Sequence, residues 1–334
     1  MISIIVPAYN SAKYLIDCLD SIANQDFDDY EVLVVNDGST DNTGEIAKQY
    51  CDNHNKFKYF YKENGGLMSS YLFALDYASG DYIGFVDSDD IIEKNMFSTL
   101  YSLSKEKKAD IVMCDYDHFP NERDEAKAII QPGLYNGLSM ENILNNIFPP
   151  FSGNHISNSR INKIFKTQLV FSIGKYLQHK SRYFEDRFFT VAAVFYANSF
   201  YYLNKTLYHV RINEIGKSNS SRTAEKLYDA IKTLASVQKE ILNDTGLFDH
   251  YKTKYDLACL NHLSLFIDRN IIYPTAPLKI KKNYAKQIIK DNFYKKLVKA
   301  YKKELIGKKG FLIKMSYFFN SPLLMATLSC LKKK

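Results

Sequence analysis

The sequence predicts an α/β fold in which a mixed, largely parallel sheet is flanked by helices and followed by a C-terminal helical region. Three observations predict it. Apolar strand-like runs alternate with helix-like segments over residues 1–118, turn-forming polar residues follow each run, and only helical patterns occur from about Arg222 onward. Strands and helices that alternate at this spacing form right-handed βαβ units with parallel strands.

The individual elements follow from local patterns. The expected strands are 2–6, 31–35, 57–61, 81–86 and 110–115. Helices are expected after the first strand, where Tyr14 to Ile22 carry an apolar stripe, after the second strand, and from Gly65-Gly66 to about Ala78. Residues 119–220 are less regular, with one clear helix after Glu185-Asp186.

Composition indicates a folded, soluble, cytoplasmic protein. Of the 334 residues 46% are hydrophobic, and the first residues lack the basic start of a signal peptide. The five cysteines are scattered without metal-type spacing, which favours reduced thiols. Residues 278–334 hold 16 lysines and two acids, which gives this tail a charge of +14. Because the net charge of the whole chain is +7, residues 1–277 together carry −7. This distribution argues against nucleic acid as a partner.

Three carboxylates crowd into the run Asp87-Ser88-Asp89-Asp90, directly after the predicted strand 81–86. Acids this close repel one another unless a cation lies among them, and carboxylate oxygens suit Mg²⁺ or Mn²⁺ shared with substrate phosphates. The alternative is structural, because Ser88, Asp89 and Asp90 could cap a helix that begins near Ile91.

Four polar segments follow neighbouring predicted strands and should converge at one edge of the sheet. They are Pro7-Ala8-Tyr9-Asn10, Asn36-Asp37-Gly38-Ser39, Asn64-Gly65-Gly66 and Asp87-Ser88-Asp89. Binding a nucleotide diphosphate needs a carboxylate or amide for the base, small residues for close backbone approach, and a cation for the phosphates. These segments supply all three.

The sequence resembles the family 2 glycosyltransferases with the GT-A fold. The resemblance is carried by "SIIVPAYN", "VVNDGSTDNT", "ENGG" and "GDYIGFVDSDD", and it extends through about residue 220. It implies a catalytic domain over residues 1–220, with a nucleotide-sugar half (1–118) and an acceptor half (119–220). Residues 221–334 would then be a C-terminal helical region with a basic amphipathic tail.

The resemblance also implies roles for individual residues. Asp37 would form a hydrogen bond with the uracil imide of a UDP-sugar. Asp87 and Asp89 would form the DxD motif. Asp89 would be the direct ligand of Mg²⁺ or Mn²⁺, and Asp87 would contact the ribose or the waters of the metal ion. The residues expected to bind the donor are Pro7, Ala8, Tyr9, Asn10, Asp37, Gly65, Gly66, Asp87, Ser88 and Arg211. One departure stands out, because Ser70-Tyr71-Leu72 replaces the Ala-Arg-Asn triplet usual in the family. Lys62 is a candidate to supply the missing cation.

A second catalytic segment is Arg182-Tyr183-Phe184-Glu185-Asp186-Arg187. The Glu-Asp pair resembles the family's "ED" motif, which makes Asp186 the candidate general base for the acceptor hydroxyl and Glu185 its support. The alternative is a pair of acids in the first turn of a helix, favoured by the helix dipole. Asn162-Lys163 resembles an acceptor-side segment, and Tyr208, His209 and Arg211 align with a stretch near the diphosphate.

The C-terminal tail combines lysines with apolar residues at helical intervals, and a break near Asp291-Asn292 should divide 279–305 into two helices. Lys314, Asn320 and Pro322 interrupt the next apolar stretch, so it is a poor membrane span and fits an interfacial amphipathic helix better. The alternative is packing on the domain or on another copy of the chain, as in a homo-oligomer.

These observations predict an inverting, metal-assisted glycosyltransferase that moves a sugar from a UDP-sugar to a hydroxyl of a glycan or lipid-linked glycan. Its expected location is the cytoplasm, peripheral on the inner face of the cell membrane. Two alternatives remain: a non-catalytic nucleotide-binding partner of another glycosyltransferase, and a sugar-nucleotide pyrophosphorylase.

Overall fold

The computed structural model describes residues 1–120, 128, 130–148, 156–178, 183–212, 224–272, 277–305 and 307–326. Arg182 and Cys330 lie outside these residues. The chain divides into two compact units. The first consists of Met1–Ile147, Asn154–Lys217 and Glu240–Thr245, and the second of Phe148–Gly153, Ser218–Lys239 and Gly246–Lys334.

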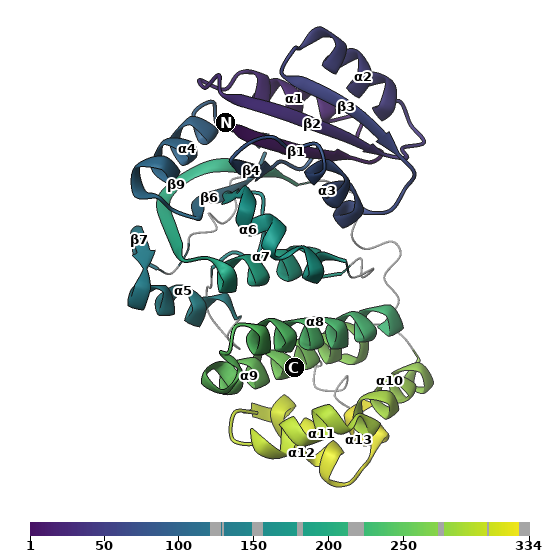
Figure 1. Cartoon of the computed structure of the whole chain (residues 1–334). Helices are drawn as coiled ribbons and strands as arrows, with labels where there is room; N and C mark the ends of the chain where they lie inside the picture. Colours follow the sequence, from purple (N-terminus) through teal and green to yellow (C-terminus); the bar gives the residue numbers. More distant parts are fainter. Residues whose placement is uncertain are drawn as a thin grey trace. The chain divides into compact units, whose positions relative to one another are not determined.

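The first unit is built on a mixed sheet with the strand order β3-β2-β1-β4-β8-β6-β9-β5, and β7 pairs with β9 (Figure 1). Strands β1, β2, β3 and β4 run parallel, whereas β8 lies antiparallel between β4 and β6. The strands are β1 Ile2–Ala8, β2 Tyr30–Asp37, β3 Phe57–Lys62, β4 Tyr82–Phe85, β5 Ile91–Ile92, β6 Ile111–Phe119, β7 Gly133–Asn136, β8 Lys163–Lys166 and β9 Ser199–Arg211. The mixed sheet flanked by helices confirms the predicted fold class.

Helices connect and cover these strands. They are α1 Leu15–Ala23, α2 Thr43–Asn53, α3 Leu67–Leu75, α4 Met96–Lys107, α5 Met140–Ile147, α6 Thr167–Ser172 and α7 Glu185–Tyr196. The central strands are buried on both faces, and β1 and β2 are buried along their whole length, which explains their continuous apolar runs. Gly84 lets α4 approach β4, because a Cβ there would lie 2.5 Å from the Phe97 ring.

Two features of the first unit differ from the sequence-based expectation. The alternative interpretation of Ser88, Asp89 and Asp90 as caps of a helix that begins near Ile91 is wrong: Ile91 and Ile92 form β5, which pairs with His209 and Tyr208 of β9, and α4 begins only at Met96. The long strand β9 was not expected. It pairs with β5, β6 and β7 and therefore closes the sheet on the side away from β3.

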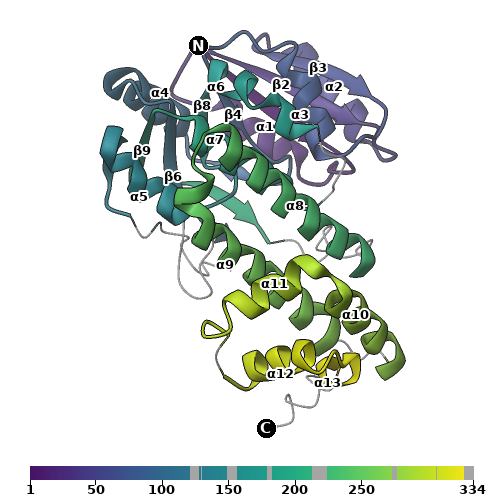
Figure 2. The same ribbon diagram turned by 60° about the horizontal axis from the view of Figure 1, so that its bottom comes forward.

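All the regular elements that the structure describes in the second unit are helices, as predicted. Helix α8 spans Ala224–Asp244, and its part up to Lys239 belongs to this unit. The other elements of the unit are α9 Phe248–Ile267, a π-helical turn Asp268–Ile272, α10 Leu278–Lys290, α11 Asn292–Ala300, α12 Gly307–Phe318 and α13 Pro322–Ala326. Asp291 separates α10 from α11 and its carboxylate accepts a hydrogen bond from Phe293 N at 2.9 Å. Helix α10 packs on α13 and α11 packs on α9 (Figure 2). Within the described part of the chain, no helix combines the length and apolar character needed to cross a membrane.

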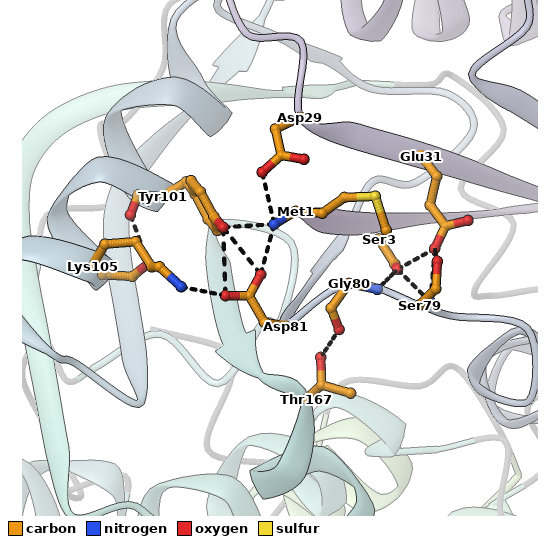
Figure 3. A network of polar contacts seen from close by, with 11 residues as sticks. Met1, Ser3, Asp29, Glu31, Ser79, Gly80, Asp81, Tyr101, Lys105 and Thr167 are labelled. Atoms are coloured by element: carbon orange, nitrogen blue, oxygen red, sulfur yellow. Dashed lines mark hydrogen bonds and ion pairs between the residues drawn. The ribbon is translucent and has the colours of Figure 1, made fainter.

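A polar network links the amino-terminal ends of β1 and β2 to the segment before β4 (Figure 3). The buried Glu31 carboxylate accepts hydrogen bonds from Ser3 Oγ at 2.7 Å, Ser79 Oγ at 2.6 Å and Lys58 Nζ at 2.8 Å. Burial alone would raise the pKa of Glu31, but these donors outweigh it and lower the pKa to about 2. The network therefore fixes the strands at the edge opposite their carboxyl ends.

We expect Glu31→Gln to destabilise the first unit by about 2 kcal/mol at pH 7, somewhat less than the full pKa shift implies because Lys58 is half exposed. Because the pKa of Glu31 is lower in the folded than in the unfolded protein, the ionised carboxylate stabilises the fold at pH values above its unfolded-state pKa. This stabilisation is lost as the pH falls toward 2. Chemical unfolding should therefore show a difference between wild type and variant that is less than half as large at pH 3 as at pH 7. Glu106→Gln, at an exposed carboxylate, is the matched control, and equal stability of wild type and Glu31→Gln at pH 7 would contradict the prediction.

Candidate active site

The loops after β1 and β2 are tied to one another at the carboxyl end of the sheet. Asn10 N donates to Ser39 Oγ at 3.1 Å, and Asn10 Oδ1 accepts from Thr40 N at 2.9 Å. Asn10 adopts a left-handed conformation with φ 48°, which asparagine tolerates better than most residues. Pro7 and Ala8 are buried within β1, whereas the side chain of Tyr9 is exposed. Of this predicted loop, Tyr9 is the residue whose ring faces solvent.

Asp37, the predicted uracil-binding residue, shapes the loop after β3. Its carboxylate is 5% exposed and accepts hydrogen bonds from Lys62 Nζ at 2.6 Å, Gly65 N at 3.0 Å and Gly66 N at 2.8 Å. The structure thus brings Asp37, Gly65 and Gly66 together. Lys62, the candidate replacement for the family's arginine, is paired with Asp37.

Strand β9 fixes the acidic loop that follows β4. The buried Asp90 carboxylate accepts hydrogen bonds from Tyr208 Oη and from Arg211 N, both at 2.8 Å. The same Tyr208 hydroxyl accepts a hydrogen bond from Asp87 N at 3.1 Å. Arg211 Nε donates to Asp89 O at 2.8 Å, so the predicted phosphate-binding arginine lies beside the predicted DxD motif. The loop geometry therefore depends on a strand that is more than a hundred residues away in sequence.

Negative charge accumulates in this loop. Burial raises the pKa of Asp87 well above its usual range, and the nearby carboxylates of Asp186 and Asp89 raise it further. Burial and the charge of Asp87 likewise raise the pKa of Asp90. The protein compensates this charge only in part, because Arg160 lowers the pKa of Asp87 without cancelling the rise.

These residues suit a divalent cation that is shared with a substrate. Among the described residues, no three histidine, cysteine, aspartate or glutamate side chains form a complete ligand set. Mg²⁺ and Mn²⁺ do not require one, because they take one or two protein carboxylates and complete their coordination with water and phosphate oxygens. Asp89 and Asp87 provide such carboxylates, and a cation there would relieve the repulsion that raises the pKa of Asp87.

Asp186, the candidate base, is the second residue of α7. Phe184, the residue before the helix, adopts a left-handed conformation with φ 62°. Its carboxylate is 45% exposed and lies 3.3 Å from Arg160 Nη2. Asp186 is close enough to Asp87 to raise the pKa of Asp87. The structure therefore brings together acids from two segments that the sequence analysis assigned to opposite sides of the reaction. Glu185 occupies the same first helical turn.

The acceptor-side segment contains a buried lysine. Lys163 Nζ donates to Ser159 O at 2.6 Å and to Asn162 Oδ1 at 2.7 Å. Burial lowers the pKa of Lys163 to about 7, although the charge of Asp186 is among those that oppose the change. Asn162 in turn donates to Cys114 O of β6, so these two predicted residues form a linked polar pair at the start of β8.

Some site residues escaped the sequence analysis. Arg160 is buried beside Asp186, and Tyr71, noted only as a departure from the family pattern, donates to Asp87 Oδ1 at 3.2 Å. The only sequence signal for Arg160 was its position two residues before Asn162-Lys163. His209 lies between two carboxylates, with Nδ1 2.6 Å from Asp117 Oδ1 and Nε2 3.1 Å from Glu93 Oε1, which gives it a structural partner on each side.

Comparisons with known proteins agree with this architecture. The model of glycosyl transferase family 2 matches residues 3–179. The putative glycosyltransferase EpsH of Bacillus subtilis is 29% identical over 268 residues, which cover 79% of this chain and 75% of EpsH. TarS of Staphylococcus aureus, a poly(ribitol-phosphate) beta-N-acetylglucosaminyltransferase, is 30% identical over 252 residues, covering 72% of this chain but 40% of TarS. The chain thus spans less than half the length of that relative.

Solved structures show the same fold. The crystal structure of S. aureus TarS 1-349 superposes with a TM-score of 0.72 at 23% identity, covering 98% of this chain and 90% of that chain. This similarity confirms the GT-A fold. Because the family model covers over half of the sequence, the chain is a transferase that belongs to glycosyltransferase family 2.

Proposed function

We propose that this chain transfers a sugar from a UDP-sugar to a hydroxyl group of a bacterial surface polysaccharide, with inversion at the anomeric carbon. The observation that carries the proposal is that Asp186 and Asp87 are joined through neighbouring side chains: Arg160 lies 3.3 Å from Asp186, and Tyr71, on which Arg160 stacks, donates to Asp87 at 3.2 Å. A direct displacement needs such an arrangement, with a base facing the acceptor and acids on the donor side of the same site. The relatives support the substrates. TarS is named for transfer to poly(ribitol phosphate), and structures of TarS 1-349 hold UDP and UDP-GlcNAc.

In this proposal Asp186 takes the proton of the acceptor hydroxyl as that oxygen bonds to the anomeric carbon. The bond from the anomeric carbon to the phosphate oxygen breaks at the same time, and UDP leaves. Glu185, in the same helical turn, supports the base. A carboxylate that is half exposed at a helix start is accessible to an acceptor and is close to its donor-side partner.

The donor side is assigned to the loops after β1, β2, β3 and β4. Asp37 would accept a hydrogen bond from the uracil imide N–H, the loop Pro7-Ala8-Tyr9-Asn10 would lie against the nucleotide, and Arg211 would face the phosphates. Asp89 and Asp87 would hold Mg²⁺ or Mn²⁺, and Ser88 lies buried between them. The metal would supply positive charge for the departing diphosphate. Family membership favours this reaction over pyrophosphorylase chemistry, which needs a glycine-rich basic loop after the first strand.

The second unit offers a surface for an anionic membrane. Phe318 is 80% exposed, Phe319 60% and Leu323 48%, at the junction of α12 and α13. The same unit carries exposed lysines along α10 and α11: Lys279, Lys282, Lys286, Lys290, Lys295, Lys296 and Lys299. Apolar side chains combined with lysines favour the headgroup region of anionic lipid. We therefore propose that this surface binds the cytoplasmic face of the membrane, where a lipid-linked glycan acceptor would be found, with a second copy of the chain as the alternative occupant.

Asp186→Asn should lower kcat for UDP release by about a hundredfold or more while UDP binding is retained, because the change removes the base and leaves the donor-binding residues in place. The measurement is UDP release from a panel of UDP-sugars in the presence of acceptor polysaccharide, with UDP affinity determined by calorimetry. Asp52→Asn, an exposed aspartate on α2, is the matched control and should behave as wild type. Wild-type rates in Asp186→Asn would remove Asp186 from the mechanism, whereas loss of UDP binding would indicate a role on the donor side.

Removal of divalent metal with EDTA should abolish UDP release, and Mn²⁺ or Mg²⁺ should restore it. Asp89→Asn should raise the Mn²⁺ concentration for half-maximal activity by tenfold or more, because a neutral amide is a weaker ligand for a hard cation. A titration of activity against Mn²⁺ in both proteins measures this shift. Full activity in EDTA would show that this member works without a metal.

Binding to vesicles tests the membrane surface. We expect the wild type to float with vesicles that contain phosphatidylglycerol and not with pure phosphatidylcholine vesicles. The double variant Phe318→Ser/Phe319→Ser should bind the phosphatidylglycerol vesicles at least tenfold more weakly, because it can no longer bury these apolar side chains in the lipid. Leu138→Ser, at a side chain 97% exposed in the first unit, is the matched control. Unchanged vesicle binding together with loss of a dimer in the double variant would assign the surface to a second copy of the chain.

A further inference from the structure

Arg160 is a charged side chain enclosed in the first unit, with 1% of its surface exposed. Its guanidinium carbon lies 3.9 Å from the centre of the Tyr71 ring and 5.8 Å from the centre of the Phe85 ring. Phe85 itself packs edge-on against Phe189 of α7 at 5.2 Å. A cation enclosed by aromatic rings is costly unless an anion compensates it, so the position of Arg160 depends on its carboxylate partners.

The guanidinium and its ring partner contact acids on both sides of the site. Arg160 Nη2 lies 3.3 Å from Asp186 Oδ1, and the Tyr71 hydroxyl donates to Asp87 Oδ1 at 3.2 Å. Within the described ranges, Arg160 Nε and Nη1 have no hydrogen-bond partner. The ion pair with Asp186 is thus the principal direct contact of this buried charge with an acid.

Of the two buried cations described near Asp186, Arg160 is the one whose charge is fixed. Lys163 is also buried near Asp186, but burial lowers the pKa of its ammonium group to about 7, so it carries a full charge only in acidic solution. An arginine side chain keeps its charge at every pH at which the protein is folded. Without Arg160, the carboxylates of Asp87 and Asp186 would lose the fixed positive charge that offsets their mutual repulsion.

We propose that Arg160 is a positioning residue of the transfer reaction, whose buried guanidinium holds the Asp186 carboxylate beside Asp87 while its stacking partner Tyr71 holds Asp87 in place. The proposal rests on the proposed role of Asp186 as the base. It assigns a function to Tyr71 in the segment where this chain departs from its family. Asp186 then faces the donor because Arg160 fixes it there.

The first experiment measures the pairing without reference to activity. Melting temperatures are determined for wild type, Asp186→Asn, Arg160→Met and the double variant. If Arg160 compensates the charge of Asp186, the change Asp186→Asn has a more destabilising effect in the wild-type background than in the Arg160→Met background, and the two shifts in melting temperature differ by several degrees. In the Arg160→Met background the same change should raise the melting temperature, because it removes repulsion with Asp87. Arg160→Gln replaces Arg160→Met if the latter does not fold.

The second experiment separates positioning from packing. Arg160→Met should lower kcat for UDP release about a hundredfold and change KM for the donor less than threefold, since a displaced base affects the reacting state. Arg160→Lys keeps the charge and should recover at least tenfold of this loss, and Tyr71→Phe should lower kcat by about tenfold. Lys56→Met removes a lysine stacked on the Tyr30 ring at 4.5 Å and should leave kcat unchanged.

The outcomes are distinct. Equal kcat values for Arg160→Met and Arg160→Lys, or additive melting temperatures, would show that Arg160 only fills space and would overturn the proposal. If the wild type releases no UDP from any donor, the proposed function fails, whereas the melting-temperature cycle still decides whether Arg160 and Asp186 act as a pair.

Discussion

Buried negative charge at the carboxyl end of β4 is the constraint on which the rest of the first unit depends. The acidic loop is stable only because donors reach it from several distant segments: the hydroxyl of Tyr208 and the backbone amide of Arg211 from β9, and the hydroxyl of Tyr71 from α3. None of these donors is near the loop in sequence. The loop can therefore take its shape only when the sheet is assembled from β4 across to β9.

The part of the fold that depends on local patterns was predictable. The buried parallel strands of the first 118 residues appear as apolar runs, and the loops that follow them carry residues whose turn chemistry is visible in the sequence. Asp37, Gly65 and Gly66 were expected at one edge of the sheet, and the structure joins them by hydrogen bonds. The division of the basic tail at Asp291 was predictable for the same reason, since an aspartate cap is a local signal.

Features that depend on contacts between distant residues were not predictable. Ile91 and Ile92 follow residues that suit a helix cap, but pairing with β9 makes them a strand. Strand β9 alternates between buried and exposed residues too irregularly to stand out in sequence. An arginine is normally exposed, and only the packing of Tyr71 and Phe85 around Arg160 reveals that this one is not.

The hydrogen bonds of Asp37 have a consequence for the choice of nucleobase. A carboxylate offers about four acceptor positions, and Lys62, Gly65 and Gly66 already occupy three of those on Asp37. One position is left for a ligand. Guanine presents two adjacent donors and would need both oxygens, whereas uracil presents a single ring N–H. In the proposed donor site, Asp37 would therefore favour uracil over guanine before any contact with the sugar is made.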